Sequence, residues 1–397
     1  MHSTPTFKQP HGLETSPMYT PLGTQRQGFE EIRLPSGHTA LNVTAYVDVK
    51  TVLTDTSFHR AQTNREGGES WLPTTMPPEM LLNLDLPDHR RMKQFVAGPY
   101  SRQGVKRVGA ACHQVLDEHL GKITLAGVRQ GDLMAQVLSP VTVGTNFAFL
   151  GLPPSDLDAI RPLAREMQMA SAADVPHLVE SFWTLYRYLE DLVEGRRPLQ
   201  DGLLRAMIDN AAHVDPPLET SELVATFLGS LVGGDQNVLT TLGKLVYICL
   251  AERDLWDHLA VDPEARVPGA VEELLRLCPL GQVSTFPRIA TQPLKLSGGQ
   301  IHPGDVVYAN THLANRDEDV FPDPLAIDLE RQGPPHLQFG YGLHHCMGSN
   351  MARLELTTIL RVLLERFPDM RLGVDASEIP WETGVLVHRP SSLPVTW

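Results

Sequence analysis

The sequence has few cysteines and no pattern that would join them. Four occur in 397 residues, far apart and without a Cys-x-x-Cys pair: Cys112, Cys249, Cys278 and Cys346. This spacing argues against a disulfide framework and against a zinc ribbon, which need paired or closely spaced cysteines. Three of the four lie in apolar, helix-like surroundings typical of small core residues. Cys346 alone lies among glycines.

An excess of positive charge is also missing. The formal net charge is -14 at pH 7, and no basic stripe occurs along the chain. A nucleic-acid surface needs a basic face to displace counterions from phosphate, so that class of protein is disfavoured. The first residues lack the charged and apolar regions of a signal peptide or membrane anchor. We therefore expect a soluble, cytoplasmic protein.

Internal repeats, low-complexity segments and linkers between two bodies are absent as well, which favours one domain. The apolar content of 42% is enough to bury a large core. The first forty residues are rich in proline, glycine and threonine. We expect residues 1–30 to form an irregular N-terminal segment and residues 31–397 to form the domain.

What the sequence does have is a helical pattern of apolar residues from about Pro87 onward, which predicts a mainly α fold with minor β sheets. Short strands are expected within residues 39–49 and 294–310, where β-branched residues alternate with turn signals. A helix is predicted to run from Ser221 to Leu250 without a break. It would be roughly 45 Å long at about 1.5 Å per residue.

The segment LQFGYGLHHCMG, residues 337–348, surrounds Cys346 with glycines and histidines. A single protein thiolate facing an open position is the arrangement that supports oxygen activation at a haem iron. The backbone must then approach a porphyrin closely and point N–H groups at the sulfur, which glycine permits. Gly340, Gly342 and Gly348 meet that need. The alternative is a buried structural cysteine beside a turn, which is the usual role of a lone cysteine.

The spacing Phe-Gly-x-Gly-x-His-x-Cys-x-Gly over residues 339–348 resembles the cysteine-ligand loop of the cytochrome P450 family. The resemblance implies a single-domain cytochrome P450 fold that binds haem b (iron protoporphyrin IX). It further implies that Cys346 is the proximal iron ligand, that Phe339 packs near the thiolate and that His344 reaches a haem propionate. Gly348 belongs to the same cofactor-binding loop. A zinc site made of the two histidines and the cysteine is disfavoured, because such close neighbours do not readily close a tetrahedron.

Further segments match the family in the same order. EELLR contains Glu273 and Arg276, whose i, i+3 spacing places them on one helix face. The resemblance implies a buried structural pair that supports the cysteine loop, whereas the pattern alone also suits a surface salt bridge. By the same resemblance Arg288 pairs with a propionate, since a guanidinium fork suits a carboxylate. In NLDLPDHRRMK, His89 falls on the haem-contacting histidine and Lys93 on a position where arginine is usual.

One segment departs from the family. LVGGDQNVL aligns with the pattern of a small residue, glycine, any residue, an acid and threonine, and Gly233 and Gly234 fit it. Gln236 replaces the acid and Asn237 replaces the threonine that together relay protons in the usual pattern. An amide cannot act as a general acid near neutral pH, although it can hold a water molecule. These catalytic positions therefore predict altered proton delivery. Asp235 is expected to point elsewhere, because successive helical residues point about 100° apart.

The substitutions leave two interpretations open. In the first, Asn237 and an ordered water replace the threonine of an ordinary monooxygenase that hydroxylates a small apolar substrate. In the second, the enzyme abstracts hydrogen or an electron and joins radicals without inserting oxygen. By resemblance, the substrate pocket is apolar with a few polar groups, which suits an aromatic or aliphatic molecule. Its candidate residues are Asn64, Trp71, Phe227, Ser284, Phe286 and Leu386.

The resemblance also implies partners. Short bacterial members of the family take electrons from an acidic ferredoxin and its reductase, so a local basic patch is expected on the cysteine side of a monomer. Candidate cations are Arg90, Arg91, Arg102, Lys106, Arg107 and Arg353. We predict an oxidative enzyme of bacterial secondary metabolism that acts on an aromatic natural product. The reaction would be carbon-carbon or carbon-nitrogen coupling, for example of a tryptophan-containing cyclic dipeptide. A haem-based sensor or carrier without turnover is a further alternative.

Overall fold

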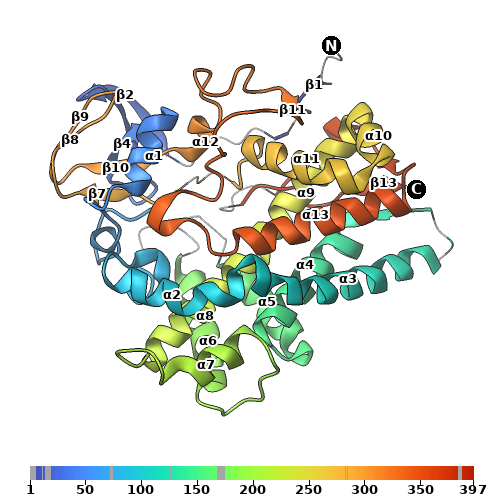
Figure 1. The fold of residues 1–397 in the computed structure, drawn as a ribbon, viewed down its shortest axis with the longest axis horizontal. Coiled ribbons are helices and arrows are strands. Elements are labelled where there is room, and N and C mark those ends of the chain that lie inside the picture. The colour runs from blue at the N-terminus through green and yellow to red at the C-terminus, as the bar shows by residue number, and fades with distance from the viewer. Residues whose placement is uncertain are drawn as a thin grey trace.

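The computed structural model describes residues 6–10, 12–13, 19–71, 75–125, 127, 129–167, 175–281, 283, 285–382 and 387–397. Helices make up most of the described chain, and the largest sheet lies at one end of the molecule (Figure 1). The mainly α architecture with minor sheets agrees with the sequence prediction. No helix in these ranges is long and apolar enough to cross a membrane.

The largest sheet has six strands in the order β2-β3-β4-β10-β7-β5. Its strands are β2 (Thr20–Arg26), β3 (Phe29–Arg33), β4 (Thr39–Val43), β10 (Val306–Ala309), β7 (Arg288–Ala290) and β5 (Phe58–His59). Strands β4 and β10 pair in parallel, and the other pairs are antiparallel. The sheet therefore joins the N-terminal part of the chain to residues 288–309.

One sequence prediction needs correction at this sheet. Residues 1–30 are not irregular throughout, because Thr20–Arg26 is strand β2 and pairs with β3 across a tight turn. Gly28 in this turn has a φ of +94°, which explains why the chain can reverse there. The strand expected within residues 39–49 is β4, which ends at Val43, and α1 (Tyr46–Thr54) begins three residues later. Residues 294–310 do contain strands, as predicted.

Three smaller sheets complete the β structure. Strand β1 (Thr6–Phe7) pairs with β11 (Ile327–Asp328), and β8 (Leu294–Lys295) pairs with β9 (Gln300–Ile301). A three-stranded sheet has the order β12-β13-β6, with β12 (Arg371–Leu372), β13 (Pro394–Thr396) and β6 (Gln130–Asp132). These pairs tie both ends of the described chain to the helical body.

The helical body is built from α2 to α13. Their bounds are α2 (Asp88–Tyr100), α3 (Arg102–Leu125), α4 (Ser139–Leu150), α5 (Leu157–Glu166), α6 (Val175–Val193), α7 (Leu203–Ala211), α8 (Thr220–Gly234), α9 (Gln236–Ala251), α10 (Arg253–Val261), α11 (Pro263–Leu277), α12 (Thr311–Ala314) and α13 (Ser349–Arg366). A π-helical turn, Met134–Leu138, leads into α4, and short 3-10 turns occupy Ala61–Thr63, Leu81–Asn83, Pro154–Asp156, Gly342–His344 and Ala376–Glu378.

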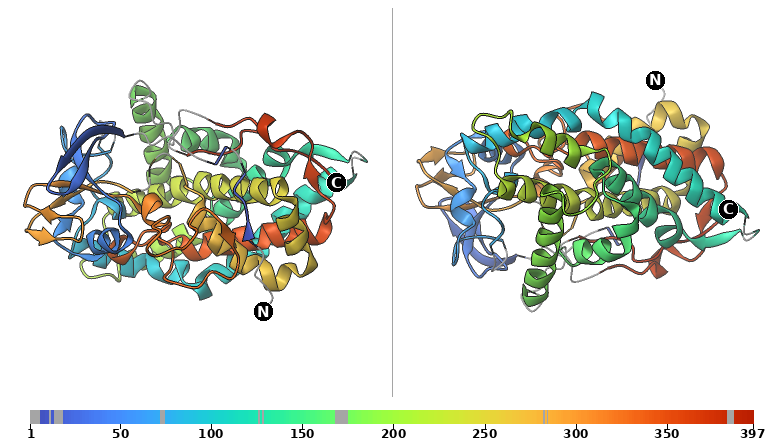
Figure 2. Two further views of the ribbon diagram at one scale, coloured as in Figure 1. Left: turned by 90° about the horizontal axis from the view of Figure 1, so that it is seen from above. Right: turned by 90° about the horizontal axis from the view of Figure 1, so that it is seen from below.

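Helices α8 and α9 cross the interior along the long axis of the molecule (Figure 2). They correspond to the predicted helix of residues 221–250, but that helix is interrupted at Asp235, whose φ and ψ are -96° and -70°. Glu219 caps α8 in a reciprocal capping box with Glu222. Side chains of α9 lie in the largest hydrophobic cluster together with α3, α11 and α13. The interruption is therefore held inside a packed core.

Candidate functional site

The cysteine segment, residues 337–348, leads directly into α13. The backbone N–H of Cys346 donates to the carbonyl of Phe339 at 2.9 Å, which closes the loop. Gly342 has a φ of +68°, and a Cβ at this position would lie 2.6 Å from the carbonyl oxygen of Leu53. Only glycine allows this approach, so the glycine pattern is explained by close backbone packing against the end of α1.

Cys346 is exposed, although its sulfur has many protein atoms around it. Desolvation by these atoms raises the pKa of the thiol. Backbone N–H groups of Gly348 and Ser349 and the cations Arg353 and Lys93 act in the opposite direction. These donors would stabilise a thiolate once its sulfur has a positive partner. The other three cysteines are buried, as the sequence indicated.

Phe339 belongs to the same segment, and its ring is held by Arg353. The guanidinium of Arg353 lies 4.6 Å from the centre of its ring, a cation–π arrangement. Arg353 also makes two hydrogen bonds to the carboxylate of Glu272, at 2.6 and 3.0 Å. The ring is thereby fixed between α11 and α13, beside the loop that carries Cys346.

A cluster of basic residues lies next to the cysteine segment. The rings of His89 and His344 meet edge to face with centres 4.5 Å apart. Burial lowers the pKa of His89 to about 4 and the pKa of Arg288 to about 10, and burial with neighbouring cations strongly lowers the pKa of His344. Lys93 donates to the carbonyl of Leu343 and, at 3.5 Å, to that of His345. The structure thus brings together four of the predicted cofactor-binding residues, His89, Lys93, Arg288 and His344, from three elements.

This cluster is short of negative charge. Asp85 is a nearby carboxylate that favours the charged forms of Arg288 and His89. Arg288 Nε and His89 Nδ1 are both buried and have no hydrogen-bond partner among the described residues. Unpartnered buried donors are costly, so the arrangement is suited to an anion that would accept from them.

Sequence reasoning missed Arg60, which belongs to this cluster. Burial and the nearby Arg288 lower the pKa of Arg60 to about 9. No local motif marks Arg60, since its contacts to Leu82 and Pro287 are long-range in sequence.

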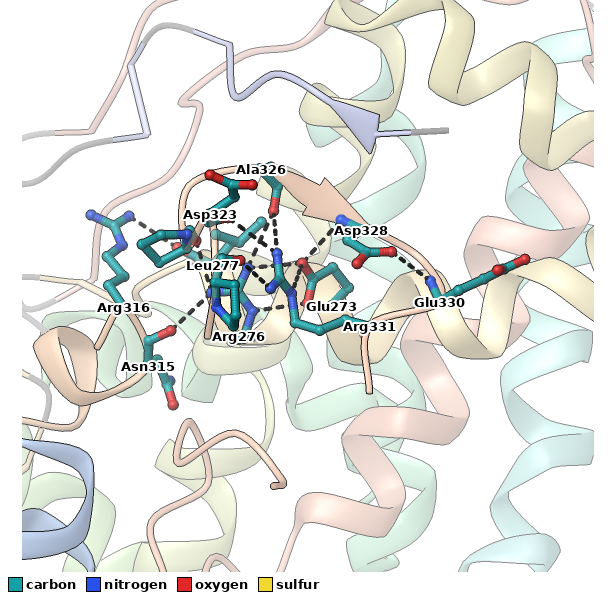
Figure 3. A network of polar contacts seen from close by, with 12 residues as sticks. Glu273, Arg276, Leu277, Asn315, Arg316, Asp323, Ala326, Asp328, Glu330 and Arg331 are labelled. Atoms are coloured by element: carbon teal, nitrogen blue, oxygen red, sulfur yellow. Dashed lines mark hydrogen bonds and ion pairs between the residues drawn. The ribbon is translucent and has the colours of Figure 1, made fainter. Parts of the chain in front are cut away.

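The Glu273–Arg276 pair is buried and sits at the centre of a larger network (Figure 3). Two parallel hydrogen bonds of 2.8 Å join the guanidinium to the carboxylate. Arg276 also donates to the carbonyl of Asn315 at 2.9 Å, and Arg331 donates to Glu273 at 3.0 Å. The backbone N–H of Asp328 donates to the same carboxylate at 3.1 Å. The surface alternative is therefore excluded, and the network ties α11 to the chain leading into the cysteine segment.

The segment that departs from the family pattern, residues 233–237, lies at the helix interruption, and its side chains are placed differently from the sequence prediction. Gly233 is exposed and Asn237 is partly exposed, whereas Asp235 and Gln236 are each only 2% exposed. Gln236 Nε2 donates to Asp235 Oδ2 at 2.6 Å. The two side chains do not point apart, because the chain leaves the regular helix between them. Asp235 also accepts from Thr142 of α4 at 3.3 Å.

Gly234 packs against α4. A Cβ on this residue would lie 2.3 Å from Oδ1 of Asn146, so a larger residue would displace the Asn146 side chain. Asn146 in turn donates to the carbonyl of Leu231 at 3.1 Å. The glycine pattern at residues 233 and 234 thus reflects one open position and one close helix contact.

The predicted pocket residues are not all in equivalent places. Asn64 is held by two hydrogen bonds of 2.9 Å to the backbone of Met76. Trp71 and Phe227 are buried in two different hydrophobic clusters. Phe286 is 37% exposed and lies under the guanidinium of Arg60. The remaining two positions, 284 and 386, which carry Ser284 and Leu386, lie outside the described residues.

Among the described residues, no group of three or more histidine, cysteine or acidic side chains could hold a metal ion. A closed zinc site of the structural type is therefore not present in these ranges. The exposed thiol of Cys346, with cations beside it, instead suits a metal carried by an anionic organic cofactor.

Comparison with known proteins bears on this interpretation. A family model described as Cytochrome P450 matches residues 267–391. Nocardicin C N-oxygenase of Nocardia uniformis subsp. tsuyamanensis is 36% identical, and the match covers 98% of each chain. Mycinamicin IV hydroxylase/epoxidase of Micromonospora griseorubida is 32% identical over 98% of each chain. A crystal structure of cytochrome P450mel 107F1, described as having biaryl coupling reactivity, superposes with a TM-score of 0.85 at 32% identity and covers 91% of each chain.

Proposed function

The chain belongs to the cytochrome P450 family, and on this premise we propose that Cys346 is the proximal ligand of a haem b with which the protein oxidises an aromatic natural product. The family makes the protein a haem-thiolate oxidoreductase. A haem bound through a thiolate supplies the electron-transfer and dioxygen chemistry of such enzymes. The observation that carries the assignment is the exposed Cys346 thiol beside a basic cluster in which Arg288 Nε and His89 Nδ1 have no hydrogen-bond partner among the described residues.

The residues present fit this cofactor. Haem carries two propionate carboxylates, and the buried Arg288 Nε–H and the ring nitrogen Nδ1 of His89 have no hydrogen-bond partner among the described residues. We assign these two side chains, with His344 and Lys93, to the propionate side. Gly348 contributes a backbone N–H next to the sulfur. Glu273 and Arg276 are assigned a structural role, because their partners are protein groups.

The reaction we propose is oxidative coupling. One hydrogen would leave each of two positions of the substrate, the two positions would bond, and dioxygen would take up these hydrogens with two electrons and two protons to give two water molecules. Support comes from the interruption at Asp235, where Gln236 is bound to Asp235 and cannot donate a proton as an acid would. The similar structure of cytochrome P450mel 107F1, described as having biaryl coupling reactivity, also supports coupling.

Simple monooxygenation is the second candidate. The two relatives named above are an N-oxygenase and a hydroxylase/epoxidase, which favours insertion of oxygen equally. Asn237 is partly exposed and could hold a water molecule where threonine is usual. In both cases the accessible Phe286 would contact the substrate.

We propose that electrons come from a ferredoxin and its reductase. Lys93 ties α2 to the cysteine segment, and α2 and α3 carry exposed cations on the same part of the molecule: Arg90, Arg102, Lys106 and Arg107. Two other candidates are already paired, Arg91 with Glu222 and Arg353 with Glu272. The four unshielded cations suit an acidic partner, because complementary charge speeds encounter.

The test is turnover of tryptophan-containing cyclic dipeptides and other aromatic candidates under labelled dioxygen, with reducing partners supplied. A coupled product free of label is expected. One labelled oxygen atom in the main product of the best-binding substrate would contradict coupling and support monooxygenation. Absence of any turnover, with haem bound and reducible, would instead favour a sensor or carrier.

A further inference from the structure

Arg60 is a buried arginine whose side chain joins three separate stretches of chain. It is 4% exposed and follows β5 at the start of the 3-10 turn Ala61–Thr63. Its Nε donates to the carbonyl of Leu82 at 3.2 Å, and its Nη1 donates to Thr63 Oγ1 at 3.3 Å and to the carbonyl of Pro287. These acceptors are all neutral, and the nearby carboxylate of Asp85 offsets part of the positive charge of Arg60.

The backbone at Arg60 is fixed as firmly as the side chain. Both carboxylate oxygens of Asp85 accept from the N–H of Arg60, at 2.9 and 3.1 Å, and one accepts from the N–H of Ala61 at 2.9 Å. Asp85 is therefore engaged by backbone groups. It holds the turn that presents Arg60 to residues 286–288.

The target of this side chain is the short stretch before strand β7. The guanidinium carbon lies 4.9 Å from the centre of the Phe286 ring, and the next residue, Pro287, supplies the acceptor carbonyl. Arg288, which follows directly, is the buried cation with an unpartnered Nε. One side chain thus contacts a candidate wall of the substrate space and the residue adjoining a candidate cofactor ligand.

We propose that Arg60 is a positioning residue that couples the two parts of the site: it holds Phe286 as a wall of the substrate space, and its charge adds to the positive potential around Arg288. This inference rests on the proposed haem site. It goes beyond that site because Arg60 itself is occupied by protein acceptors and needs no contact with the cofactor.

Two substitutions separate the roles. Arg60→Lys keeps the charge but loses the planar fork that reaches several acceptors at once. Arg60→Gln loses both. Arg65→Gln is the matched control, because Arg65 lies five residues away on the surface and pairs with Glu69. The reduction potential of each protein is measured on the haem-loaded holoenzyme. The dissociation constants of imidazole and 4-phenylimidazole are measured on the same protein. Binding of the larger ligand depends on the position of the Phe286 wall, whereas binding of the smaller ligand depends on access to the iron.

Loss of the charge should shift the potential of Arg60→Gln to a more negative value, because less positive potential remains to favour the added electron. Arg60→Lys should keep the parent potential. In both variants the ratio of the two dissociation constants should change by about threefold or more. Phe286→Leu, at an accessible position that tolerates change, should alter the ratio and leave the potential unchanged. An unaltered ratio in both Arg60→Lys and Phe286→Leu, or an unaltered potential in Arg60→Gln, overturns the proposal.

A readout on haem-free protein keeps this inference separate from the proposed function. Amide hydrogen exchange over residues 285–290 should be faster in Arg60→Lys than in the parent and the Arg65→Gln control, since the tether to Pro287 is weakened. A parent protein without a thiolate signature would refute the haem assignment. Unchanged exchange in Arg60→Lys would refute the tether, and Arg60→Gln failing to fold would leave Arg60→Lys and Phe286→Leu to decide.

Discussion

Gln236 Nε2 lies 2.6 Å from Asp235 Oδ2, and this hydrogen bond joins two consecutive side chains at the point where the long central helix is interrupted. The amide is turned with its nitrogen toward the carboxylate, and Gln236 Oε1 has no partner among the described residues. Arg389 approaches from the C-terminal segment, with Nη1 3.4 Å from the carbonyl of Gln236 and from Thr240 Oγ1. The interruption is thus a fixed polar junction.

Restoring the usual residues at this junction should change the reaction. Asn237→Thr places a hydroxyl at the partly exposed position, and Gln236→Asp supplies an acid beside it. We expect the double variant to lose coupled product and to gain product carrying one labelled oxygen atom, measured by mass under labelled dioxygen. An unchanged product and an unchanged yield of product per electron would show that these side chains do not control proton delivery.

The single substitution Gln236→Asp should also lower the unfolding free energy, and this loss provides a control. Gln236→Asp puts a second carboxylate against Asp235 in a buried position, where burial already raises the pKa of Asp235. We expect this single variant to lose about 2 kcal/mol of unfolding free energy, within the range for an uncompensated buried polar group. Asn237→Thr should be nearly neutral in the same denaturation experiment. Equal losses in both variants would contradict the assignment of Gln236 to the protein interior.

The buried network around Glu273 leads to a prediction about the unfolding free energy. Glu273→Gln would leave Arg276 and Arg331 without their shared carboxylate, and loss of one partner of a buried pair costs about 3–5 kcal/mol. Glu264→Gln is the matched control, because that side chain is 77% exposed and pairs with Arg361 at the surface. We expect urea unfolding to show a large loss for the first variant and about 0.5 kcal/mol or less for the second. Similar losses in the two variants would mean that the network contributes little to the unfolding free energy.

The parts of the site that could be predicted from sequence are those encoded locally. The cysteine loop needs glycines at fixed offsets, and Glu273 and Arg276 share a helix face through their spacing. The interruption at Asp235 could not be predicted, because it depends on packing against Thr142 and Asn146 of another helix. Strand β2 was missed for a similar reason, since a proline- and glycine-containing stretch becomes a strand only by pairing with β3.

Lys244 allows a prediction about pH. It is fully buried in α9, donates to the carbonyl of Pro279 at 2.6 Å, and burial lowers its pKa from 10.5 to about 7. Between these two values the unfolded chain binds a proton that the folded protein does not, so the unfolding free energy contributed by Lys244 rises with pH. The slope is at most about 1.4 kcal/mol per pH unit. Below about pH 7 the folded protein must bury the charge.

Lys244→Met removes this dependence. We expect the stability of the variant, relative to the parent, to be highest near pH 6 and to decline as the pH rises toward 10. Urea unfolding at fixed pH values measures the difference, and Lys122→Met on the surface, where Lys122 pairs with Glu118, is the control. A difference that does not vary with pH would mean that Lys244 keeps its charge throughout.

The last prediction concerns Cys346. If its sulfur ligates iron, the reduced protein with carbon monoxide should show the red-shifted Soret band that strong thiolate donation produces. Cys346→Ala should abolish the band, because the three remaining cysteines are buried. Cys249→Ala is the matched control, since it removes a thiol from the interior of α9 and should leave the band intact. A Cys346→Ala protein that retained both haem and the red-shifted band would exclude Cys346 as the ligand. Loss of the band with retention of haem would show that the basic cluster can hold the cofactor without the thiolate.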